Sequence, residues 1–260
     1  LDYLWAKDVR FTACFALSNT IMFKQGIDDV IADHPRISGC WVITGANSGI
    51  GLALSRMLGG QKVPLLLIDR QVDKLGEFSC AEVLQADLTN EADIDRICNV
   101  VGKRRIRCLV NNAGIGVRGT LQHIRQEEIK RIVSINSLAP VLLTRGLIDQ
   151  LIAQESVIIN IASSIAYNPL PYMSLYSSSK AFVSNWSESL TYELRRTNRV
   201  VTFSPSGTLT SFQNSSGVKL RNEGKGLLSP EFVAGRILKA ERGGGPVVIL
   251  GWPTKVLLLV

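Results

Sequence analysis

The chain has 260 residues, of which 46% are hydrophobic and 20% charged, and its formal net charge is +7 at pH 7. This length and composition allow one large domain with a full core, and they exclude a disordered or fibrous protein. The five cysteines are widely spaced, and His34 and His123 are the only histidines. The pattern favours reduced core thiols in a cytoplasmic protein over a disulfide framework or a metal site.

The positive charge is densest at Lys103, Arg104, Arg105 and Arg107. Such a run can bind nucleic acid or an anionic membrane. No aromatic side chains interleave it, so a solvated turn is the better interpretation and we expect no nucleic-acid partner.

Residues 1–38 show apolar residues at helical spacing and end near His34-Pro35, where proline breaks a helix. We interpret 1–38 as an N-terminal helical extension and 39–260 as a single domain. The apolar stretch Phe11–Phe23 is too short to cross about 30 Å of hydrocarbon as a helix. The chain closes on a second apolar run, Val256–Val260. Peripheral membrane contact is therefore an alternative to a purely cytoplasmic location.

From Cys40 onward, short apolar runs alternate with segments of helical spacing. The predicted strands are Cys40–Thr44, Val63–Ile68, Val83–Gln85, Cys108–Asn111, Val157–Ile161, Val200–Ser204 and Pro246–Leu250. The predicted helices are Gly51–Leu58, Glu91–Val101, Glu127–Leu151, Tyr176–Arg196 and Pro230–Lys239. Buried strands separated by helices predict an α/β fold, a Rossmann-like doubly wound parallel sheet of about seven strands.

A glycine-rich turn lies between the first predicted strand and the helix after it. Glycines there permit a tight turn and close approach of a pyrophosphate, while the helix N-terminus offers N–H donors and a positive dipole end. We predict that a dinucleotide contacts Thr44, Gly45, Asn47, Ser48, Gly49, Ile50 and Gly51.

Two neighbouring residues bear on the choice of cofactor. Asp69 ends the second predicted strand, where a carboxylate can bind the adenosine ribose hydroxyls and repel a 2′-phosphate. Arg70 can instead bind that phosphate. We favour NAD(H), with NADP(H) as the alternative.

These elements together resemble the short-chain dehydrogenase/reductase family over roughly residues 40–250. Asp87-Leu88-Thr89 is similar to the family's adenine-contacting turn, which implies roles for Asp87 and Leu88. The run 111–114 resembles its Asn-Asn-Ala-Gly motif, which implies that Asn112, Ala113 and Gly114 line the cofactor cleft. The run 205–210 is similar to the loop that receives the nicotinamide, which implies contacts from Pro205, Gly207 and Thr210. Ser206 departs from the glycine usual in that loop.

The candidate catalytic pair is Tyr176 and Lys180, four residues apart and so on one face of a helix. A neighbouring ammonium favours the phenolate, so we expect Lys180 to lower the pKa of Tyr176. The resemblance implies that Lys180 also holds the nicotinamide ribose and that Ser163 positions the substrate oxygen, with Ser164 as the alternative serine. It further implies that Asn136 holds a water beside the lysine.

The resemblance implies an NAD(P)(H)-dependent oxidoreductase that interconverts a secondary alcohol and a ketone and needs no metal. The apolar, aromatic segment Ile165–Leu175 and the polar segment Ser211–Ser229 are predicted to cover a lipid, acyl or steroid-like substrate. A homodimer or homotetramer through the two long helices is also implied. The alternative is a non-catalytic NAD(H)-binding sensor or a membrane-associated interaction protein.

Overall fold

The computed structural model describes residues 38–210 and 227–251. The predicted N-terminal extension up to residue 37, the apolar end 256–260 and most of Ser211–Ser229 lie outside the described residues.

The described chain is built on one parallel sheet of seven strands, as predicted. Their order across the sheet is β3-β2-β1-β4-β5-β6-β7, and every neighbouring pair is parallel. The order reverses between β1 and β4, the point at which open α/β sheets bind ligands beyond the carboxyl ends of their strands. The strands are β1 Cys40–Thr44, β2 Leu65–Asp69, β3 Ala81–Gln85, β4 Ile106–Asn111, β5 Val157–Ile161, β6 Val200–Ser204 and β7 Val247–Ile249.

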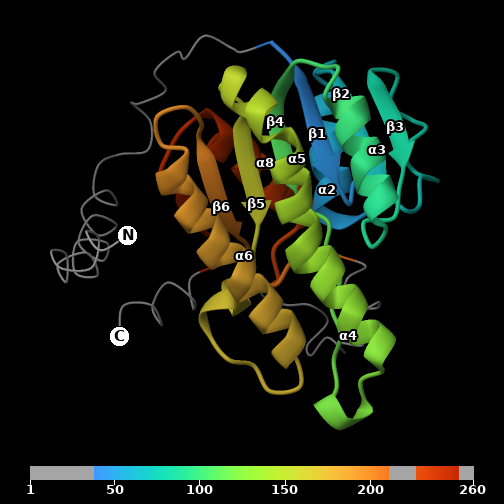
Figure 1. Ribbon diagram of the computed structural model, residues 1–260, viewed down its shortest axis with the longest axis vertical. Coiled ribbons are helices and arrows are strands. Elements are labelled where there is room, and N and C mark those ends of the chain that lie inside the picture. Colours follow the sequence, from blue (N-terminus) through green and yellow to red (C-terminus); the bar gives the residue numbers. More distant parts are fainter. Residues whose placement is uncertain (1–37, 211–226, 252–260) are drawn as a thin grey trace, which may run out of the picture.

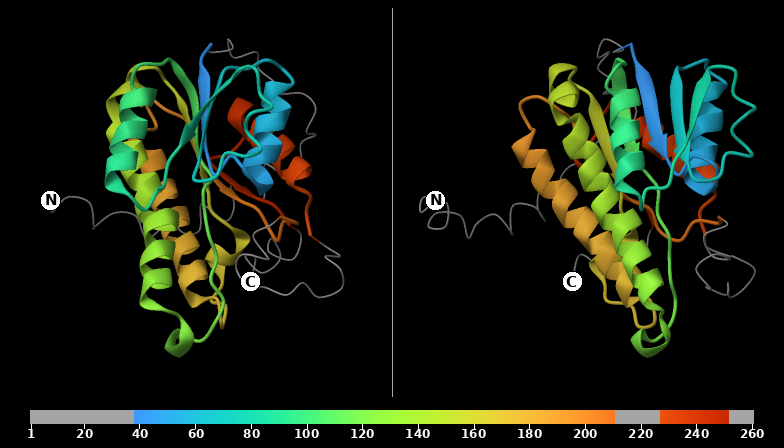
Figure 2. Two further views of the ribbon diagram at one scale, coloured as in Figure 1. Left: turned by 90° about the vertical axis from the view of Figure 1, so that its right-hand side faces the viewer. Right: turned by 45° about the vertical axis from the view of Figure 1, so that its right-hand side comes forward.

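Helices cover both faces of this sheet, which makes three layers (Figure 1). One face carries α2 (Gly49–Gly59) and α8 (Pro230–Arg242), which pack against each other. The other face carries α3 (Glu91–Val101), α5 (Ala139–Ala153) and α6 (Ser174–Glu193). The turned views in Figure 2 show the two helix layers on opposite sides of the strands.

The core on each face follows from the alternation of side chains along the strands. In β1, Trp41 and Ile43 join the cluster under α2 and α8, whereas Cys40 and Val42 join the cluster under α3 and α5. All four side chains are buried. Because helices cover both faces of the sheet, the sequences of the strands are nearly continuous apolar runs.

Four strands differ in their bounds from those predicted, and one of them, β7, is one residue shorter at each end. The differences in β2, β3 and β4 are larger. β2 begins at Leu65 because Pro64 has no N–H to join the ladder. β3 is an edge strand with no fully buried residue, so its start carries no apolar run. β4 begins at Ile106 and includes Arg107, whose guanidinium pairs with Glu241 at 2.8 Å.

The predicted helix Glu127–Leu151 is not regular. It consists of α4 (Gln126–Val133), a π-helical turn (Ser134–Leu138) and α5. Pro140 explains the wide turn, because in an α-helix the N–H of residue 140 would donate to the carbonyl of Asn136, and proline has no N–H.

The whole segment Gln126–Ala153 is long and apolar enough to cross a membrane by length and composition. Its apolar side chains already have a place in the fold. Leu143, Leu147 and Leu151 of α5 are buried against the sheet. We therefore attribute the apolar character of this helix to packing in the core.

The fold accounts for several of the cysteines and for part of the basic run. Cys40, Cys80, Cys98 and Cys108 are free thiols, whereas Cys14 lies outside the described residues. Burial raises the pKa of Cys40 to about 11, which makes that thiol a poor nucleophile. Arg104 is paired with Glu82, so part of the basic run is used within the domain.

Candidate active site

A cavity of about 530 Å³ opens at the carboxyl edge of the sheet, beside the switch point between β1 and β4. Most of the predicted site residues line it. These are Gly45, Ser48, Gly49, Ile50, Asn112, Ala113, Gly114, Ser163, Tyr176, Lys180, Pro205, Gly207 and Thr210. Segments far apart in the sequence therefore meet at one wall.

The glycine-rich turn requires glycine at two positions. A Cβ on Gly51 would lie 2.2 Å from the carbonyl oxygen of Gly45, which no side chain tolerates. Gly45 has φ of +67° and leaves only 2.8 Å between a built Cβ and the Cα of Ala113. The N-terminus of α2 can therefore approach the cavity closely and face it with N–H donors.

Thr44 and Asn112 join this turn to the Asn-Asn-Ala-Gly loop. The Thr44 hydroxyl accepts from the backbone N–H groups of Asn112 and Ala113, each at 3.1 Å. The Asn112 amide donates to the carbonyls of Thr44 and Gly45 at 2.9 and 3.1 Å. Thr44 thus supports the site rather than lining the cavity.

The side chain of Asn47 also has a supporting role. It is buried, its amide donates to the Asp73 carboxylate at 2.7 Å, and its carbonyl accepts from the Lys74 N–H at 2.9 Å. Gly51, likewise a predicted cofactor contact, lies behind the cavity wall and shapes the turn.

Asp69 is the last residue of β2, as the cofactor prediction requires. One carboxylate oxygen accepts from the Asn47 N–H at 2.9 Å and the other from the Gln71 N–H at 3.1 Å. A carboxylate has about four acceptor positions, so it retains capacity for two hydroxyl donors. Arg70 beside it is exposed. Neither residue lines the main cavity.

Asp87 lies at the end of β3 and is fixed by its own turn. Its carboxylate accepts from the backbone and hydroxyl of Thr89 at 2.9 and 2.8 Å. Burial opposes ionisation, but these bonds and the charges of Arg70 and Arg131 lower the pKa of Asp87 below its usual range. Leu88 packs against the α3 side of the core. Asp87 and Leu88 therefore lie outside the main cavity, and their contacts with the adenine stay a prediction.

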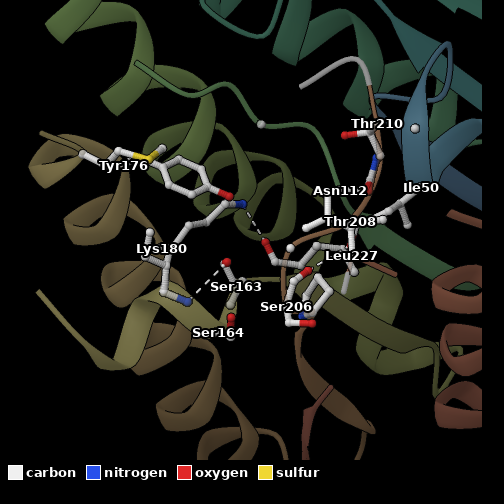
Figure 3. A pocket seen from close by; sticks show the side chains of 18 of the residues that line it. Ile50, Asn112, Ser163, Ser164, Tyr176, Lys180, Ser206, Thr208, Thr210 and Leu227 are labelled. Carbon is white, nitrogen blue, oxygen red and sulfur yellow. Dashed lines mark hydrogen bonds between the residues drawn. The ribbon is translucent and has the colours of Figure 1, made fainter. Parts of the chain in front are cut away.

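Tyr176, Lys180 and Ser163 converge at one wall of the cavity (Figure 3). The Ser163 side chain hydrogen-bonds Tyr176, whereas Ser164 contributes its backbone N–H to Pro205 at 2.9 Å. Lys180 is 4% exposed, and its ammonium donates to the carbonyl of Ile161 at 2.8 Å. This geometry favours Ser163 over Ser164 as the partner of the tyrosine.

The pKa of Tyr176 differs in direction from the sequence expectation. Burial raises the pKa of Tyr176 to about 12, and the hydrogen bond from Ser163 only partly opposes it. Burial also lowers the pKa of Lys180 to about 8. Desolvation penalises both charged forms, so it outweighs the attraction between phenolate and ammonium on which the expectation rested. At neutral pH the phenol is therefore protonated.

Asn136 lies in the π-helical turn and is 1% exposed. Its carboxamide accepts from the N–H of Ile115 at 2.8 Å and donates to the carbonyl of Ile115 and the hydroxyl of Ser179. A Cβ on Gly114 would lie 3.3 Å from the Lys180 ammonium and 3.5 Å from the Asn136 carboxamide oxygen. Asn136 and Lys180 therefore meet beside Gly114.

The loop after β6 closes the other side of the cavity. Pro205, Ser206, Gly207, Thr208 and Thr210 all line it. Thr210 packs against the turn of α2, because a Cβ on Gly49 would lie 3.0 Å from its methyl group. Ser206, where the family pattern has glycine, lines the cavity, and its carbonyl accepts from the Thr208 hydroxyl at 2.9 Å.

The apolar lining comes mainly from one segment. Ile165, Leu170 and Met173 line the cavity together with Leu227, whereas Tyr167 and Tyr172 of the same segment do not. The cations Lys219, Arg221 and Lys225 of the second covering segment lie outside the described residues. Leu227 was not predicted individually, because no motif marks the residues between Thr210 and α8.

A sheet of this order, with a glycine turn at its switch point and a Tyr-x-x-x-Lys pair in the adjoining cavity, defines a dinucleotide-dependent oxidoreductase. The model of the short chain dehydrogenase family matches residues 40–220, and the chain belongs to this family. This confirms the resemblance inferred from the motifs. The chain is 32% identical over 205 residues to mouse 17-beta-hydroxysteroid dehydrogenase type 3, covering 72% of this chain and 67% of that protein.

Solved structures of the family match the fold. A short-chain dehydrogenase from Sphingobium yanoikuyae in complex with NADPH has a TM-score of 0.76 and 26% identity, covering 85% of this chain and 91% of that one. A 3-ketoacyl-(acyl-carrier-protein) reductase from Brucella melitensis complexed with NADH has a TM-score of 0.71 and 30% identity, covering 81% and 95%. Similar proteins thus bind either nicotinamide cofactor.

Proposed function

We propose that the protein interconverts a secondary alcohol and a ketone with a nicotinamide cofactor, on an apolar substrate. The observation that carries this proposal is the convergence of Tyr176, Lys180 and Ser163 in the cavity that the glycine-rich turn borders. The cofactor fits this cavity by its chemistry, because Gly45 and Gly49 leave the backbone of the cavity wall bare and the N-terminus of α2 supplies N–H donors. When bound, the nicotinamide supplies or accepts a hydride.

The residues of the chain handle the proton and the substrate oxygen. Tyr176, protonated at neutral pH, donates its proton to the carbonyl oxygen during ketone reduction and takes it back during alcohol oxidation. Ser163 holds that oxygen by a second hydrogen bond. Lys180, buried beside Gly114 and Asn136, would hold the nicotinamide ribose and supply positive charge there.

The apolar wall supports a lipid, acyl or steroid-like substrate. The apolar wall consists mainly of Ile165, Leu170 and Met173. Burial of a hydrocarbon substrate against these side chains is favourable. The volume of about 530 Å³ lies within the range of roughly 300–1,000 Å³ typical of small-molecule sites. The mouse protein is named a hydroxysteroid dehydrogenase and the Brucella protein a ketoacyl reductase, and these names support steroid-like and acyl substrates.

We infer that NAD(H) is preferred over NADP(H). The two backbone N–H bonds to Asp69 hold its carboxylate at the end of β2, beside the glycine-rich turn. A carboxylate there suits two ribose hydroxyls and repels a phosphate. Arg70 opposes this preference, and we assign it the weaker influence because it is exposed and its charge acts on Asp87.

We also infer a homodimer or homotetramer with access to apolar substrates at a membrane surface. Val133, Leu138, Phe182 and Tyr192 are large apolar residues of the α4–α6 layer that are each more than 40% exposed. Peripheral membrane contact rests on the apolar stretches 11–23 and 256–260, which lie outside the described residues.

An absorbance assay tests the proposed function. Each cofactor is offered with 3-oxoacyl thioesters, ketosteroids and the matching alcohols, and the nicotinamide absorbance is followed. Turnover of at least one apolar pair is expected. A protein that binds the cofactor and turns over none of them would be the non-catalytic sensor instead.

A further inference from the structure

We propose that Tyr167 is a positioning residue, which fixes the segment carrying Ser163 against the helix carrying Lys180 and against the end of β6. This proposal rests on the proposed function. Tyr167 lies four residues after Ser163, in the short helix Ser164–Tyr167, and does not line the main cavity. Its partly buried side chain reaches Ser184 and Ser204 instead.

The phenol of Tyr167 joins three elements through a chain of hydroxyl groups. Its oxygen lies 3.3 Å from the Oγ of Ser204 and 3.1 Å from the Oγ of Ser184. The Oγ of Ser184 lies 3.0 Å from a carboxylate oxygen of Glu188. Ser204 and Ser184 are 0% and 5% exposed, so water has little access to these two hydroxyls.

Each end of this chain adjoins a proposed catalytic element. Ser204 is the last residue of β6 and directly precedes Pro205 and Ser206 of the cavity wall. Ser184 and Glu188 follow Lys180 at intervals of four, so all three share one face of α6. A single phenol therefore ties the serine segment to both the lysine helix and the nicotinamide loop.

The serine hydroxyls depend on the Tyr167 oxygen as a partner. A serine or tyrosine hydroxyl carries one proton and donates once. Ser184 is placed to donate either to the Tyr167 oxygen or to the Glu188 carboxylate, so its proton serves one of them at a time. In the bond between Tyr167 and Ser204, either hydroxyl can be the donor. Removing the Tyr167 oxygen therefore takes away a hydrogen-bond partner of both serines.

Few backbone bonds join this segment to its surroundings. At the ends of the short helix, the Ala166 N–H donates to the Ser163 carbonyl at 3.0 Å and the Asn168 N–H donates to the Ile165 carbonyl at 3.3 Å. Ser164 adds the bond to Pro205. Catalytic groups need support of this kind, because a displacement of about 1 Å can cost on the order of 100-fold in rate.

Tyr167→Phe tests the proposal, since it removes one oxygen and keeps the ring. We expect kcat to fall about tenfold, with cofactor affinity changed less than about twofold, because a displaced Ser163 weakens the transition state more than cofactor binding. Amide hydrogen exchange should become faster in residues 163–168 and stay unchanged in β1 and β2. Ser189→Ala removes an exposed hydroxyl of α6, which donates to the Asn185 carbonyl of that helix at 3.0 Å, and this variant should match the unmodified protein.

A second variant separates a linked chain from independent bonds. If the chain acts as one unit, Tyr167→Phe combined with Ser184→Ala should lower kcat no further than Tyr167→Phe alone. The proposal would be overturned by losses of kcat that add in the double variant, or by an unchanged kcat in Tyr167→Phe. It would also be overturned if Tyr167→Phe made exchange faster across the whole sheet and abolished cofactor binding. Failure of the proposed function looks different, because the unmodified protein would then turn over no substrate. The exchange comparison requires no substrate and still tests the contact.

Discussion

Tyr176 carries the proton in the proposed reaction, and its hydroxyl is the simplest group to remove. Tyr176→Phe keeps the ring in the cavity wall and deletes the donor. We expect kcat to fall by at least about 100-fold with nearly unchanged cofactor affinity. Steady-state turnover and a cofactor titration by fluorescence measure the two quantities. Retention of turnover in this variant would contradict the role of Tyr176.

Lys180 makes a prediction about stability as well as activity. Its folded-state pKa of about 8 lies below the ordinary value of 10.5. The unfolded chain therefore binds more protons between these pH values, and stability rises as pH rises from about 8 toward 10.5. Below pH 8 the charged, buried lysine destabilises the fold by about 3 kcal/mol, the equivalent of that shift.

Lys180→Met should consequently abolish turnover and still raise the free energy of unfolding at pH 6.5. We expect a net gain of about 1–2 kcal/mol, because the lost bond to the Ile161 carbonyl offsets part of the relief. Urea denaturation at pH 6.5 and 9.5 measures it. The gain should be smaller at pH 9.5, and a gain that grows with pH would show that Lys180 is not destabilising.

Asp69 and Arg70 determine the predicted choice of cofactor. Asp69→Ser should remove the repulsion and leave Arg70 to pair with a 2′-phosphate, shifting the ratio of kcat/KM toward NADP(H) by roughly 5- to 150-fold. Arg70→Ala should hardly change the use of NAD(H). If the unmodified protein prefers NADP(H) and Arg70→Ala removes that preference, Arg70 dominates and our assignment of Asp69 is wrong.

At the scale of elements, the sequence predicted the strands that are buried on both sides and missed the details set by neighbours. β1, β5 and β6 have the predicted bounds because their apolar runs are continuous. The strand predicted for β3 was too short because this edge strand lacks a continuous apolar run. The motif residues of the cavity could be predicted because each motif is local. Tyr167 could not be assigned its role, because its partners lie 17 and 37 residues away.

The function of the π-helical turn can be tested by replacing Pro140. Pro140→Ala supplies an N–H at the position that an α-helix would use to bind the Asn136 carbonyl. We expect the helix to become regular, with a loss of about tenfold in kcat and no loss of thermal stability, since alanine favours helix over proline. Leu138→Ala, an exposed position in the same turn, is the matched control. If Pro140→Ala kept the same kcat as Leu138→Ala, the π-helical turn would have no role in catalysis.

The helices α4, α5 and α6 lie in one layer of the described molecule (Figure 1). Large apolar side chains of this layer, among them Val133 and Phe182, are exposed. We predict a homodimer or homotetramer through this layer at micromolar concentration, measured by light scattering after size exclusion. Phe182→Glu, at a residue 47% exposed, should shift the mass toward a monomer because a carboxylate is costly to bury. A monomeric mass for the unmodified protein would contradict this prediction.

The central claim is that Tyr176, Lys180 and Ser163 make this chain an oxidoreductase for apolar alcohols and ketones. The most direct test follows nicotinamide absorbance after the protein is mixed with NADH and a long-chain 3-oxoacyl thioester or a ketosteroid, beside the Tyr176→Phe variant. We expect the absorbance of the reduced nicotinamide to fall with the unmodified protein and to fall at a rate at least about 100-fold lower with Tyr176→Phe. Equal rates for the two proteins, or cofactor binding without any change in absorbance for either substrate class and either cofactor, would contradict it.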